Sequence, residues 1–358
     1  MEKLIDIAIP FFIQEFNEEM KNAAINALEN ETFVGGESII KFEEEFARYI
    51  GTKFAIAVSS GNSALHLSLM ALGISESSKV ATSTNSFIAS ANCIQMVNAK
   101  PVLADINSGD GNIDLNSIKT PVDAIIPVHI YGNPCDFDAV KAFSEENKIP
   151  IIEDACQAHG AIYRDKKVGG ISDAGCFSFY PTKNMTVGGD GGMVTTNNEE
   201  ILKKISSIRD NGRGETRNVF DRFGYTMRLN SVNAAIGRIQ LKGLDKKNER
   251  KQEIARMYKE NLNEDIMLKE NPHGKSVFHQ IVIKHEKRDQ IQKQLGENNI
   301  QTAIHYPIPI HKQPIYQSLN LKLENSEKFS SQILSLPSYP TIDNESVITV
   351  CDEINKIL

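Results

Sequence analysis

The chain has 358 residues, 41% of them hydrophobic and 24% charged, which predicts a folded protein with one large and one small domain. The formal net charge of −7 and the lack of a basic stripe argue against binding to nucleic acid, because phosphate recognition needs clustered lysines and arginines. No run approaches the ~18 apolar residues of a membrane span and no signal peptide is visible, so we expect a cytoplasmic protein that does not contact a membrane.

The cysteines and the densest basic segment do not indicate a ligand site. Five cysteines are odd in number and lack CxxC spacing, which predicts reduced, mostly buried thiols and no metal centre: Cys93, Cys135, Cys156, Cys176 and Cys351. The basic segment from Lys242 to Lys251 also carries Asp245 and Glu249, so we interpret it as the solvated face of a helix.

Strand-like and helix-like segments alternate through the first two thirds of the chain. A helix is expected at residues 15–28, and further helices at 63–72, 90–97 and 137–147. Short apolar runs predict strands at 54–58, 79–83, 102–105, 124–128 and 149–153, with another at 193–195. This alternation predicts an α/β fold whose mainly parallel sheet has helices on both faces.

The pattern changes near residue 240. A long polar helix is expected at 240–263, then a strand-like segment at 278–283, a helix at 288–298 and a strand-like segment at 302–305. We therefore predict a large domain over residues 1–240, including the N-terminal segment, and a smaller C-terminal α/β domain over residues 241–358.

Three strand ends carry polar side chains that belong together, because ligands of such sheets bind beyond the carboxyl ends of the strands. They are Ser59–Ser63, Asp154 with Gln157, and Ser178–Lys183. The first joins a strand to a helix, where free amides and the helix dipole attract anions, although a helix-capping role explains the same residues. Phe87 follows another strand and suits either stacking on a flat ring or core packing.

Lys183 lies in the segment Phe177-Ser-Phe-Tyr-Pro-Thr-Lys183, between two apolar strands and before the loop Gly188-Gly-Asp-Gly-Gly192. An amine at one strand end and the carboxylate of Asp154 at another suit pyridoxal phosphate, whose aldehyde needs an amine and whose pyridine nitrogen needs an acid. Asp154 could instead cap a helix. Gln157 could donate to the 3-oxygen of the ring, and His159 is either catalytic or a satisfied buried histidine.

The ordered set of motifs resembles the DegT/DnrJ/EryC1/StrS family of sugar aminotransferases, which are fold type I pyridoxal phosphate enzymes. The resemblance covers nearly the whole chain and rests on the following segments: Phe42–Gly51, Ser59-Ser-Gly61, Ser86-Phe-Ile-Ala89, Val128-His-Ile-Tyr-Gly132, Glu153-Asp-Ala-Cys-Gln-Ala-His-Gly160, Phe177–Asn184, Gly189-Asp-Gly-Gly192, Gly224-Tyr-Thr-Met-Arg-Leu229, Ala234-Ala-Ile-Gly237 and His305-Tyr-Pro-Ile-Pro-Ile-His311.

The resemblance implies a role for each matching residue. Lys183 would form the Schiff base with the cofactor, Asp154 would hold pyridine N1, and Gln157 would contact the 3-oxygen. The remaining cofactor contacts implied are Gly61, Asn62, Ser63 and Ser178 at the phosphate and Phe87 on the ring. Residues implied on the sugar side are His159, Arg228, His305, Tyr306 and His311.

The family also implies a homodimer whose active sites lie at the subunit interface. Its Gly224 motif commonly supplies an asparagine to the partner's phosphate site, and this chain has Thr226 at that position. A threonine hydroxyl has a shorter reach than an asparagine amide, so Thr226 marks a departure from the family pattern.

The resemblance implies transfer of an amino group, from L-glutamate through pyridoxamine phosphate, to a nucleotide-linked 3- or 4-keto hexose. The product would be an amino sugar for polysaccharide biosynthesis, and the motifs leave the aminated carbon open. Two alternatives are a keto-sugar dehydratase of the same fold, which Lys183 disfavours because such dehydratases lack a lysine there, and a non-catalytic regulatory homologue.

Overall fold

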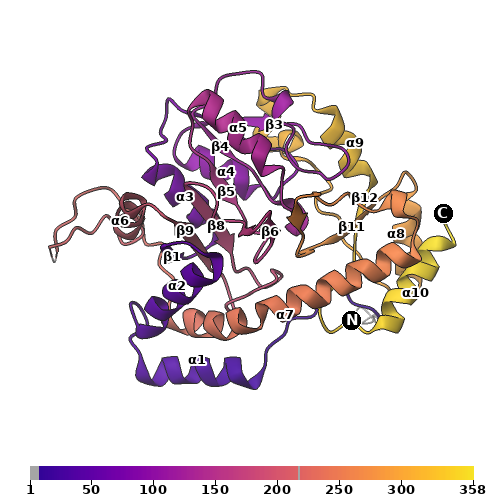
Figure 1. Cartoon of the computed structure of the whole chain (residues 1–358), viewed down its shortest axis with the longest axis horizontal. Coiled ribbons are helices and arrows are strands. Elements are labelled where there is room, and N and C mark those ends of the chain that lie inside the picture. The colour runs from indigo at the N-terminus through magenta and orange to yellow at the C-terminus, as the bar shows by residue number, and fades with distance from the viewer. Residues whose placement is uncertain (1–7, 217) are drawn as a thin grey trace.

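The computed structural model describes residues 8–216 and 218–358. A four-stranded sheet of order β1-β9-β8-β5 and a three-stranded sheet of order β3-β2-β4 form its centre (Figure 1). Parallel bridges from Ile125 to Ile151 and from Val128 to Asp154 join the two along β4 and β5. In this combined sheet β9 alone runs antiparallel to its neighbours. The mainly parallel sheet expected from the sequence is therefore confirmed.

The strands of the described residues have these bounds: β1 Phe54–Val58, β2 Lys79–Ser83, β3 Lys100–Ala104, β4 Ala124–Ile126, β5 Ile152–Asp154, β6 Ile162–Tyr163, β7 Lys166–Lys167, β8 Ala174–Ser178, β9 Gly192–Thr196, β10 Gly274–Lys275, β11 Ile281–Lys284 and β12 Ile333–Leu336. The helices are α1 Glu18–Asn30, α2 Glu37–Ile50, α3 Gly61–Ala71, α4 Ala89–Met96, α5 Phe137–Asn147, α6 Glu199–Ile208, α7 Ser231–Asn261, α8 Arg288–Glu297, α9 Glu324–Gln332 and α10 Asn344–Asn355. Short 3₁₀ turns occur at Leu115–Ser117, Ile130–Gly132, Glu264–Ile266, Ile310–Lys312 and Pro314–Leu319.

Burial on both faces explains the apolar strands. Along β1, Ala55 and Ala57 belong to one core cluster and Ile56 and Val58 to another, as the alternation of side chains across a strand requires. The first cluster includes apolar residues of α2, α5 and α7, and the second includes those of α3, α4 and α6. Each face of the sheet is therefore covered by helices, and the polar strand ends remain at its edge.

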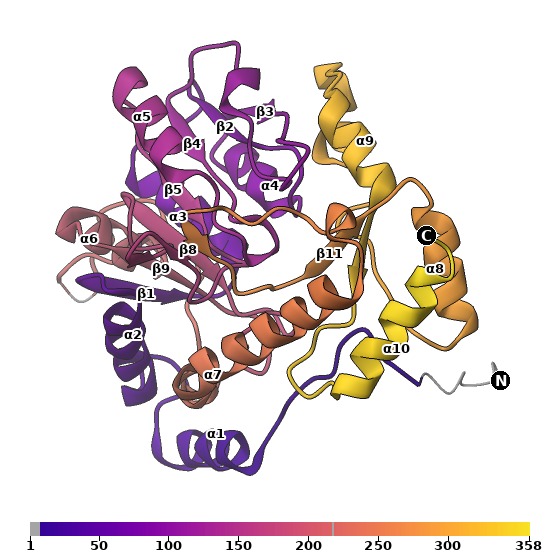
Figure 2. The same ribbon diagram turned by 45° about the vertical axis from the view of Figure 1, so that its right-hand side comes forward.

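Helix α7 is longer than the sequence pattern predicts. It begins at Ser231 rather than near residue 240, and Asn230 caps it by accepting the amide of Asn233 at 2.9 Å. Its first turns are apolar and buried at Ala234 and Leu241, so the polar pattern used for prediction covers only its later part. Figure 2 shows α7 running from α1 and α2 toward β11.

The C-terminal part has a core of its own. Antiparallel strands β11 and β12 pack with α8, α10 and the end of α7, and Ile9 from the N-terminal segment joins this cluster. The strand expected at 302–305 is only a single bridge between Ala303 and Ser335. The strand expected at 278–283 begins at Ile281 instead, because Phe278 has a φ of +45°, which is not extended backbone. Because residue 240 lies inside α7, we propose that this helix connects the two parts.

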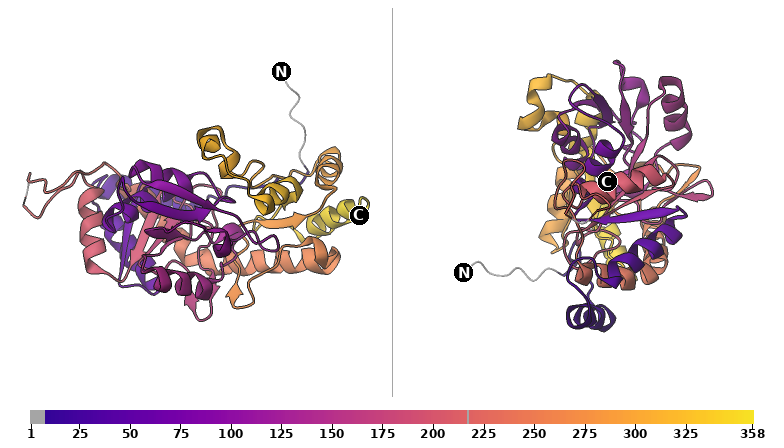
Figure 3. Two further views of the ribbon diagram at one scale, coloured as in Figure 1. Left: turned by 90° about the horizontal axis from the view of Figure 1, so that it is seen from above. Right: turned by 90° about the vertical axis from the view of Figure 1, so that its left-hand side faces the viewer.

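The segment between α6 and α7 extends away from the body of the molecule (Figure 3). Antiparallel bridges join Asp210 to Thr226 and Arg213 to Phe220, so it is a hairpin. Among the residues that the structure describes, no helix is both long and apolar enough to cross a membrane.

Candidate active site

A cavity of about 460 Å³ lies beyond the carboxyl ends of β5 and β8 and is closed by segments of the C-terminal part. This is the position expected for a ligand of such a sheet. It brings together nine of the residues singled out in the sequence: Gly61, Asn62, Phe87, Asp154, Gln157, Ser178, Lys183, His305 and Tyr306.

Lys183 lies in the loop that joins β8 to β9. Its backbone amide bonds to the carbonyl of Tyr180 at 2.9 Å, and the next residue, Asn184, donates from Nδ2 to the carbonyl of Val277 at 2.9 Å. The loop is thus tied to the second part of the chain. Burial lowers the pKa of the Lys183 ammonium, and nearby Cys156 and Asp154 only partly offset this. A larger neutral fraction leaves more of the amine able to act as a nucleophile or to accept a proton.

Asp154 ends β5 and is 4% exposed. Its Oδ2 accepts the hydroxyl of Ser90 at 2.7 Å, and its Oδ1 accepts the amide of Cys156 at 3.2 Å. A carboxylate offers about four acceptor positions, so these two bonds fix Asp154 and leave capacity for a donor in the cavity. The capping alternative fails because the residues after Asp154 form a turn rather than a helix.

Gln157 is held in one orientation by two bonds. Its Oε1 accepts the amide of Tyr131 at 2.9 Å, and its Nε2 donates to the hydroxyl of Tyr306 at 3.3 Å. The amide nitrogen therefore faces the cavity side, where it has one further hydrogen to donate. Tyr306 and His305 belong to the 303–312 segment, and His305 is fixed by a 2.9 Å bond from its Nδ1 to Ser335.

The N-terminus of α3 supports both roles considered for the Ser59–Ser63 segment, helix capping and anion binding. Ser60 caps the helix by accepting the amide of Ser63 at 3.0 Å, and the Ser63 hydroxyl bonds back to Ser59 and Ser60, so Ser63 does not line the cavity. Gly61 and Asn62, which follow the cap, do line it. Helix amides and dipole at this point favour an anion in the cavity.

Gly61 is a position where no side chain fits. A Cβ atom there would lie 2.7 Å from Cβ of Ser178 and 2.8 Å from Sγ of Cys156. Asn62 Oδ1 is buried and has no hydrogen-bond partner among the described residues. The end of α3 is thus shaped to let a ligand approach the backbone closely.

Phe87 lies on the wall of the cavity rather than in the core. Its side chain is 56% exposed, and its ring centroid is 6.1 Å from that of Tyr306. An aromatic ring left exposed beside a cavity is available to stack on a planar ligand, which favours the stacking role over core packing.

Other residues singled out in the sequence lie outside the cavity lining. His159 is 1% exposed and packs on Phe177 and Phe179, and burial next to Lys183 lowers its pKa to about 3. His311 bonds to Thr84 at 2.8 Å and to Glu327 at 3.2 Å. Both ring nitrogens of His311 are therefore occupied within the protein.

Thr226 belongs to the projecting hairpin, and Arg228 follows it and bridges to Val58 of β1. The Thr226 hydroxyl donates to Oδ1 of Asn211 at 3.1 Å, and Arg228 pairs with Asp210 at 2.8 Å. Neither side chain lines the cavity of its own chain.

The sequence analysis gave no role to several further residues that line the cavity, among them Cys156, Tyr180, Asp190, His279 and Gln280. Cys156 comes two residues after Asp154 at the same strand end, so its position along the chain could have found it. His279 and Gln280 precede β11, in the second part of the chain. No motif links them to Lys183, because only the tertiary fold brings these segments together.

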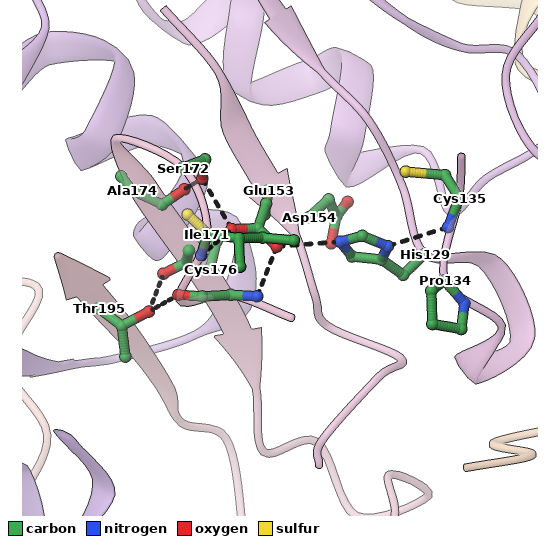
Figure 4. Close-up of polar contacts among 12 residues, drawn as sticks. His129, Pro134, Cys135, Glu153, Asp154, Ile171, Ser172, Ala174, Cys176 and Thr195 are labelled. Atoms are coloured by element: carbon green, nitrogen blue, oxygen red, sulfur yellow. Dashed lines mark hydrogen bonds and ion pairs between the residues drawn. The ribbon is translucent and has the colours of Figure 1, made fainter. Parts of the chain in front are cut away.

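Behind Asp154, the side chain of Glu153 is fully buried and organises the neighbouring loops (Figure 4). Its carboxylate accepts the amides of Gly169 at 2.6 Å and Ile171 at 3.0 Å, the hydroxyl of Ser172 at 2.8 Å, and Nε2 of His129 at 3.2 Å. The other nitrogen of His129 accepts a backbone N–H, so Nε2 carries the hydrogen. This network fixes the strand end from which Asp154 projects.

The interpretation of residues 242–251 as a solvated helix face is wrong for Lys251. Lys242 and Lys246 are exposed, but Lys251 is 6% exposed, and its Nζ donates to the carbonyl of Ser338 at 2.7 Å and to its hydroxyl at 3.3 Å. The charge pattern could not show this, because the C-terminal segment that covers Lys251 is distant in sequence.

The family model described as the DegT/DnrJ/EryC1/StrS aminotransferase family matches residues 14–355. The chain belongs to this family. It is 37% identical to dTDP-3-amino-3,6-dideoxy-alpha-D-galactopyranose transaminase of Aneurinibacillus thermoaerophilus, over 95% of this chain and 96% of that protein. It is 33% identical to UDP-2-acetamido-2-deoxy-3-oxo-D-glucuronate aminotransferase of Pseudomonas aeruginosa, over 89% of this chain and 90% of that protein.

A solved structure agrees with these relatives. That of S. venezuelae DesV superposes with a TM-score of 0.92 at 32% identity, covering 95% of this chain and 94% of the other. The fold of this DegT/DnrJ/EryC1/StrS chain is thus that of fold type I pyridoxal phosphate aminotransferases, and pyridoxal phosphate is its cofactor.

The residues present fit that cofactor. The recess at Gly61 and the end of α3 suit a phosphate, and the bonded carboxylate of Asp154 suits a protonated ring nitrogen. Lys183 supplies an amine of lowered pKa in the same cavity.

Proposed function

We propose that this aminotransferase moves the amino group of L-glutamate to a nucleotide-linked 3-keto hexose. The observation that carries the proposal is the placement of Lys183 and Asp154 in one cavity of the family's fold. The names of relatives support the acceptor: several act on dTDP- or UDP-linked sugars that carry an amino or oxo group at C3. Transfer would convert the donor into its 2-oxo acid and the sugar ketone into an amine.

When bound, pyridoxal phosphate supplies an electron-withdrawing ring that holds the amino group between donor and acceptor. We assign the end of α3, with Ser178, to its phosphate and Asp154 to its ring nitrogen. Gln157 would donate to the ring oxygen, and Phe87 would cover one face. These contacts would orient the cofactor against Lys183.

Lys183 has two tasks in this proposal. Its amine would hold the cofactor through the aldehyde carbon, and as a free amine it would take and return the proton at the reacting carbon. Burial lowers its pKa below that of an ordinary lysine, which increases the share of the amine that is neutral at any given pH. His305 and Tyr306 border the cavity opposite the sheet and would meet the sugar.

We propose that the enzyme works as a cytoplasmic homodimer. The projecting hairpin exposes Val219, Phe220 and Phe223, and Phe223 is 75% exposed, which is unusual for an isolated aromatic side chain. Contact with a partner would bury these side chains and carry Thr226 toward the partner's cavity. Free cysteines among the described residues agree with a reducing compartment.

The decisive experiment compares wild type with Lys183→Ala. The purified wild type should show the near-visible absorbance of bound pyridoxal phosphate and should lose it on addition of L-glutamate. Lys183→Ala should lose the band and lower amino transfer by at least about 10⁴-fold, the range expected when nucleophile and base are removed together.

Product analysis separates the proposal from its rival. Mass spectrometry of dTDP- and UDP-linked 3-keto and 4-keto sugars after reaction should show the mass of an amino sugar. Loss of water from the sugar without gain of nitrogen would identify a dehydratase and overturn the proposal, as would full activity in Lys183→Ala.

A further inference from the structure

A second, smaller cavity of about 60 Å³ adjoins Lys183. It shares Thr182, Lys183, His279 and Gln280 with the cofactor cavity, so the two cavities adjoin at these residues. Further residues of the Lys183 loop line it, and its other walls come from three separate parts of the chain: the N-terminal segment at residues 11–15, helix α7, and residues 338–340. The sequence offers no motif for such a site, because these segments meet only in the fold.

The charged groups around this cavity favour an anion. Its lining includes three lysines, Lys183, Lys247 and Lys251, and one carboxylate, Glu15. Glu15 pairs with Lys247 at 2.7 Å, so its charge is already balanced. Lys183 is assigned to the cofactor, so the ammonium of Lys251 is left without a carboxylate partner among the described residues.

Lys251 is the more deeply buried of these two side chains. Its two hydrogen-bond acceptors are the neutral oxygens of Ser338, although an ammonium has three hydrogens to donate. Burial lowers its pKa to about 7, with Glu15 acting weakly in the opposite direction. A buried ammonium without a counterion is costly, and an anion within reach would remove that cost.

His279 adds an independent indication of a ligand. It is 7% exposed, lines both cavities, and its Nδ1 is buried with no hydrogen-bond partner among the described residues. Buried polar atoms in proteins almost always have a partner, so an orphan nitrogen on a cavity wall indicates a group that arrives with a ligand.

We propose that this cavity binds a carboxylate of the amino donor, with Lys251 as its counterion and His279 as a hydrogen-bond partner. The inference rests on the proposed aminotransferase function. An α-amino acid carries its carboxylate one carbon from the reacting bond, so the carboxylate subsite must adjoin the lysine that moves the proton, as this cavity does. A volume of about 60 Å³ suits a carboxylate or a few water-sized groups and excludes a nucleotide.

The test uses Lys251→Met, which keeps an unbranched side chain only one atom shorter and removes its charge. Lys251→Gln, which can still donate to Ser338, serves as a second variant if the first folds poorly. Lys246→Met is the matched control, because it removes the same charge from an exposed position on the same helix. Glutarate serves as the binding probe, since it has the carboxylates of glutamate but no amine to react.

Calorimetry on the pyridoxal phosphate form measures glutarate binding, and single-turnover spectra measure the two half-reactions separately. We expect Lys251→Met to weaken glutarate at least about 10-fold and to lower the glutamate half-reaction about 100-fold, as loss of a buried charge partner does. The sugar half-reaction, started from enzyme loaded with pyridoxamine phosphate, should stay within about twofold. Lys246→Met should match wild type in all three measurements.

Three results would overturn the inference: no glutarate binding by wild type, unchanged binding in both Lys251 variants, or an equal loss in both half-reactions. The last would show that Lys251 serves the fold rather than the donor. Failure of the proposed function looks different, because wild type itself would then show no spectral change with glutamate.

Discussion

At the residue scale, Gly61 shows how a missing side chain shapes the site. Alanine there would place Cβ within 2.8 Å of both Ser178 and Cys156, closer than unstrained carbon contacts allow. We expect Gly61→Ala to cost about 1–3 kcal/mol of stability and to weaken pyridoxal phosphate at least about 10-fold. Urea unfolding and cofactor titration measure the two effects.

Gly243→Ala is the control for this substitution. Gly243 lies within α7, and a Cβ atom there would meet no atom within 4 Å. Alanine should therefore stabilise the protein by up to about 1 kcal/mol through helix propensity and leave cofactor affinity unchanged. Equal cofactor affinity in Gly61→Ala and wild type would contradict the role given to the recess.

His66 on α3 is expected to limit stability in acid. It is 1% exposed, neither ring nitrogen has a partner among the described residues, and burial lowers its pKa to about 4. The unfolded chain binds the proton at a higher pH than the folded one, so the stability present above about pH 6.5 is lost as pH falls toward 4.

The substitution His66→Leu removes the imidazole and with it this dependence of stability on pH. We expect His66→Leu to be about 1 kcal/mol more stable at pH 7, because no buried polar group is left unbonded, and to exceed wild type further at pH 5. Urea unfolding at both pH values measures the difference. A difference that does not change with pH would show that His66 does not titrate on unfolding.

At the element scale, β5 depends on one buried carboxylate. Glu153 accepts four hydrogen bonds from a histidine and from the loop at residues 169–172. Glutamine keeps the volume but can accept only at its single carbonyl oxygen, and its amide hydrogens would face backbone N–H groups. We expect Glu153→Gln to cost about 2–3 kcal/mol in urea unfolding.

Glu145→Gln provides the comparison, because Glu145 is exposed on α5 and pairs only with Lys141 across one helical turn. Its effect should stay within about 0.5 kcal/mol. Equal stability of Glu153→Gln and wild type would show that the network does not hold the strand end.

The elements that the sequence predicted well are those whose signal is local. Strands β1 and β2 and helix α5 have the predicted bounds, because a short apolar run or an amphipathic turn pattern defines them. The start of α7 and the failed strand at 302–305 depended on tertiary packing instead. The helix begins earlier than predicted because its first turns are buried against the rest of the protein. The segment at 302–305 pairs with its neighbour at only one bridge, between Ala303 and Ser335.

The same distinction applies to the site. Lys183, Asp154 and Gln157 lie at strand ends, so a sheet rule places them together without a structure. Lys251 and His279 could not be found this way. A lysine in a charged helical segment has the same sequence pattern whether it is solvated or covered, and the covering residues here lie nearly ninety positions away, at Ser338.

At the scale of the whole molecule, the projecting hairpin predicts a dimer. Phe220 and Phe223 are exposed on it, and their replacement by serine should remove apolar area that a partner would bury. We expect Phe220→Ser/Phe223→Ser to shift the mass measured by light scattering from dimer toward monomer, and to weaken pyridoxal phosphate at least about 10-fold.

Ile348→Ser is the matched substitution, because Ile348 is 42% exposed on α10, far along the chain from the hairpin. It should leave mass and cofactor affinity unchanged. A double hairpin variant that remains a dimer with full affinity would place the interface elsewhere.

Because β9 is antiparallel to β1 and β8, it begins beside the ends of both strands, next to the start of α3. Gly192 pairs with Val58 on one side and with Ser178 on the other, and a side chain at Gly192 would collide with the backbone of Ser60. The ends of β1 and β8 and the start of β9 are therefore packed tightly together beside the N-terminus of α3. The loop from 179 to 191, which carries the reacting amine, leaves and re-enters the sheet at this three-segment junction, so both of its ends are fixed beside the end of α3.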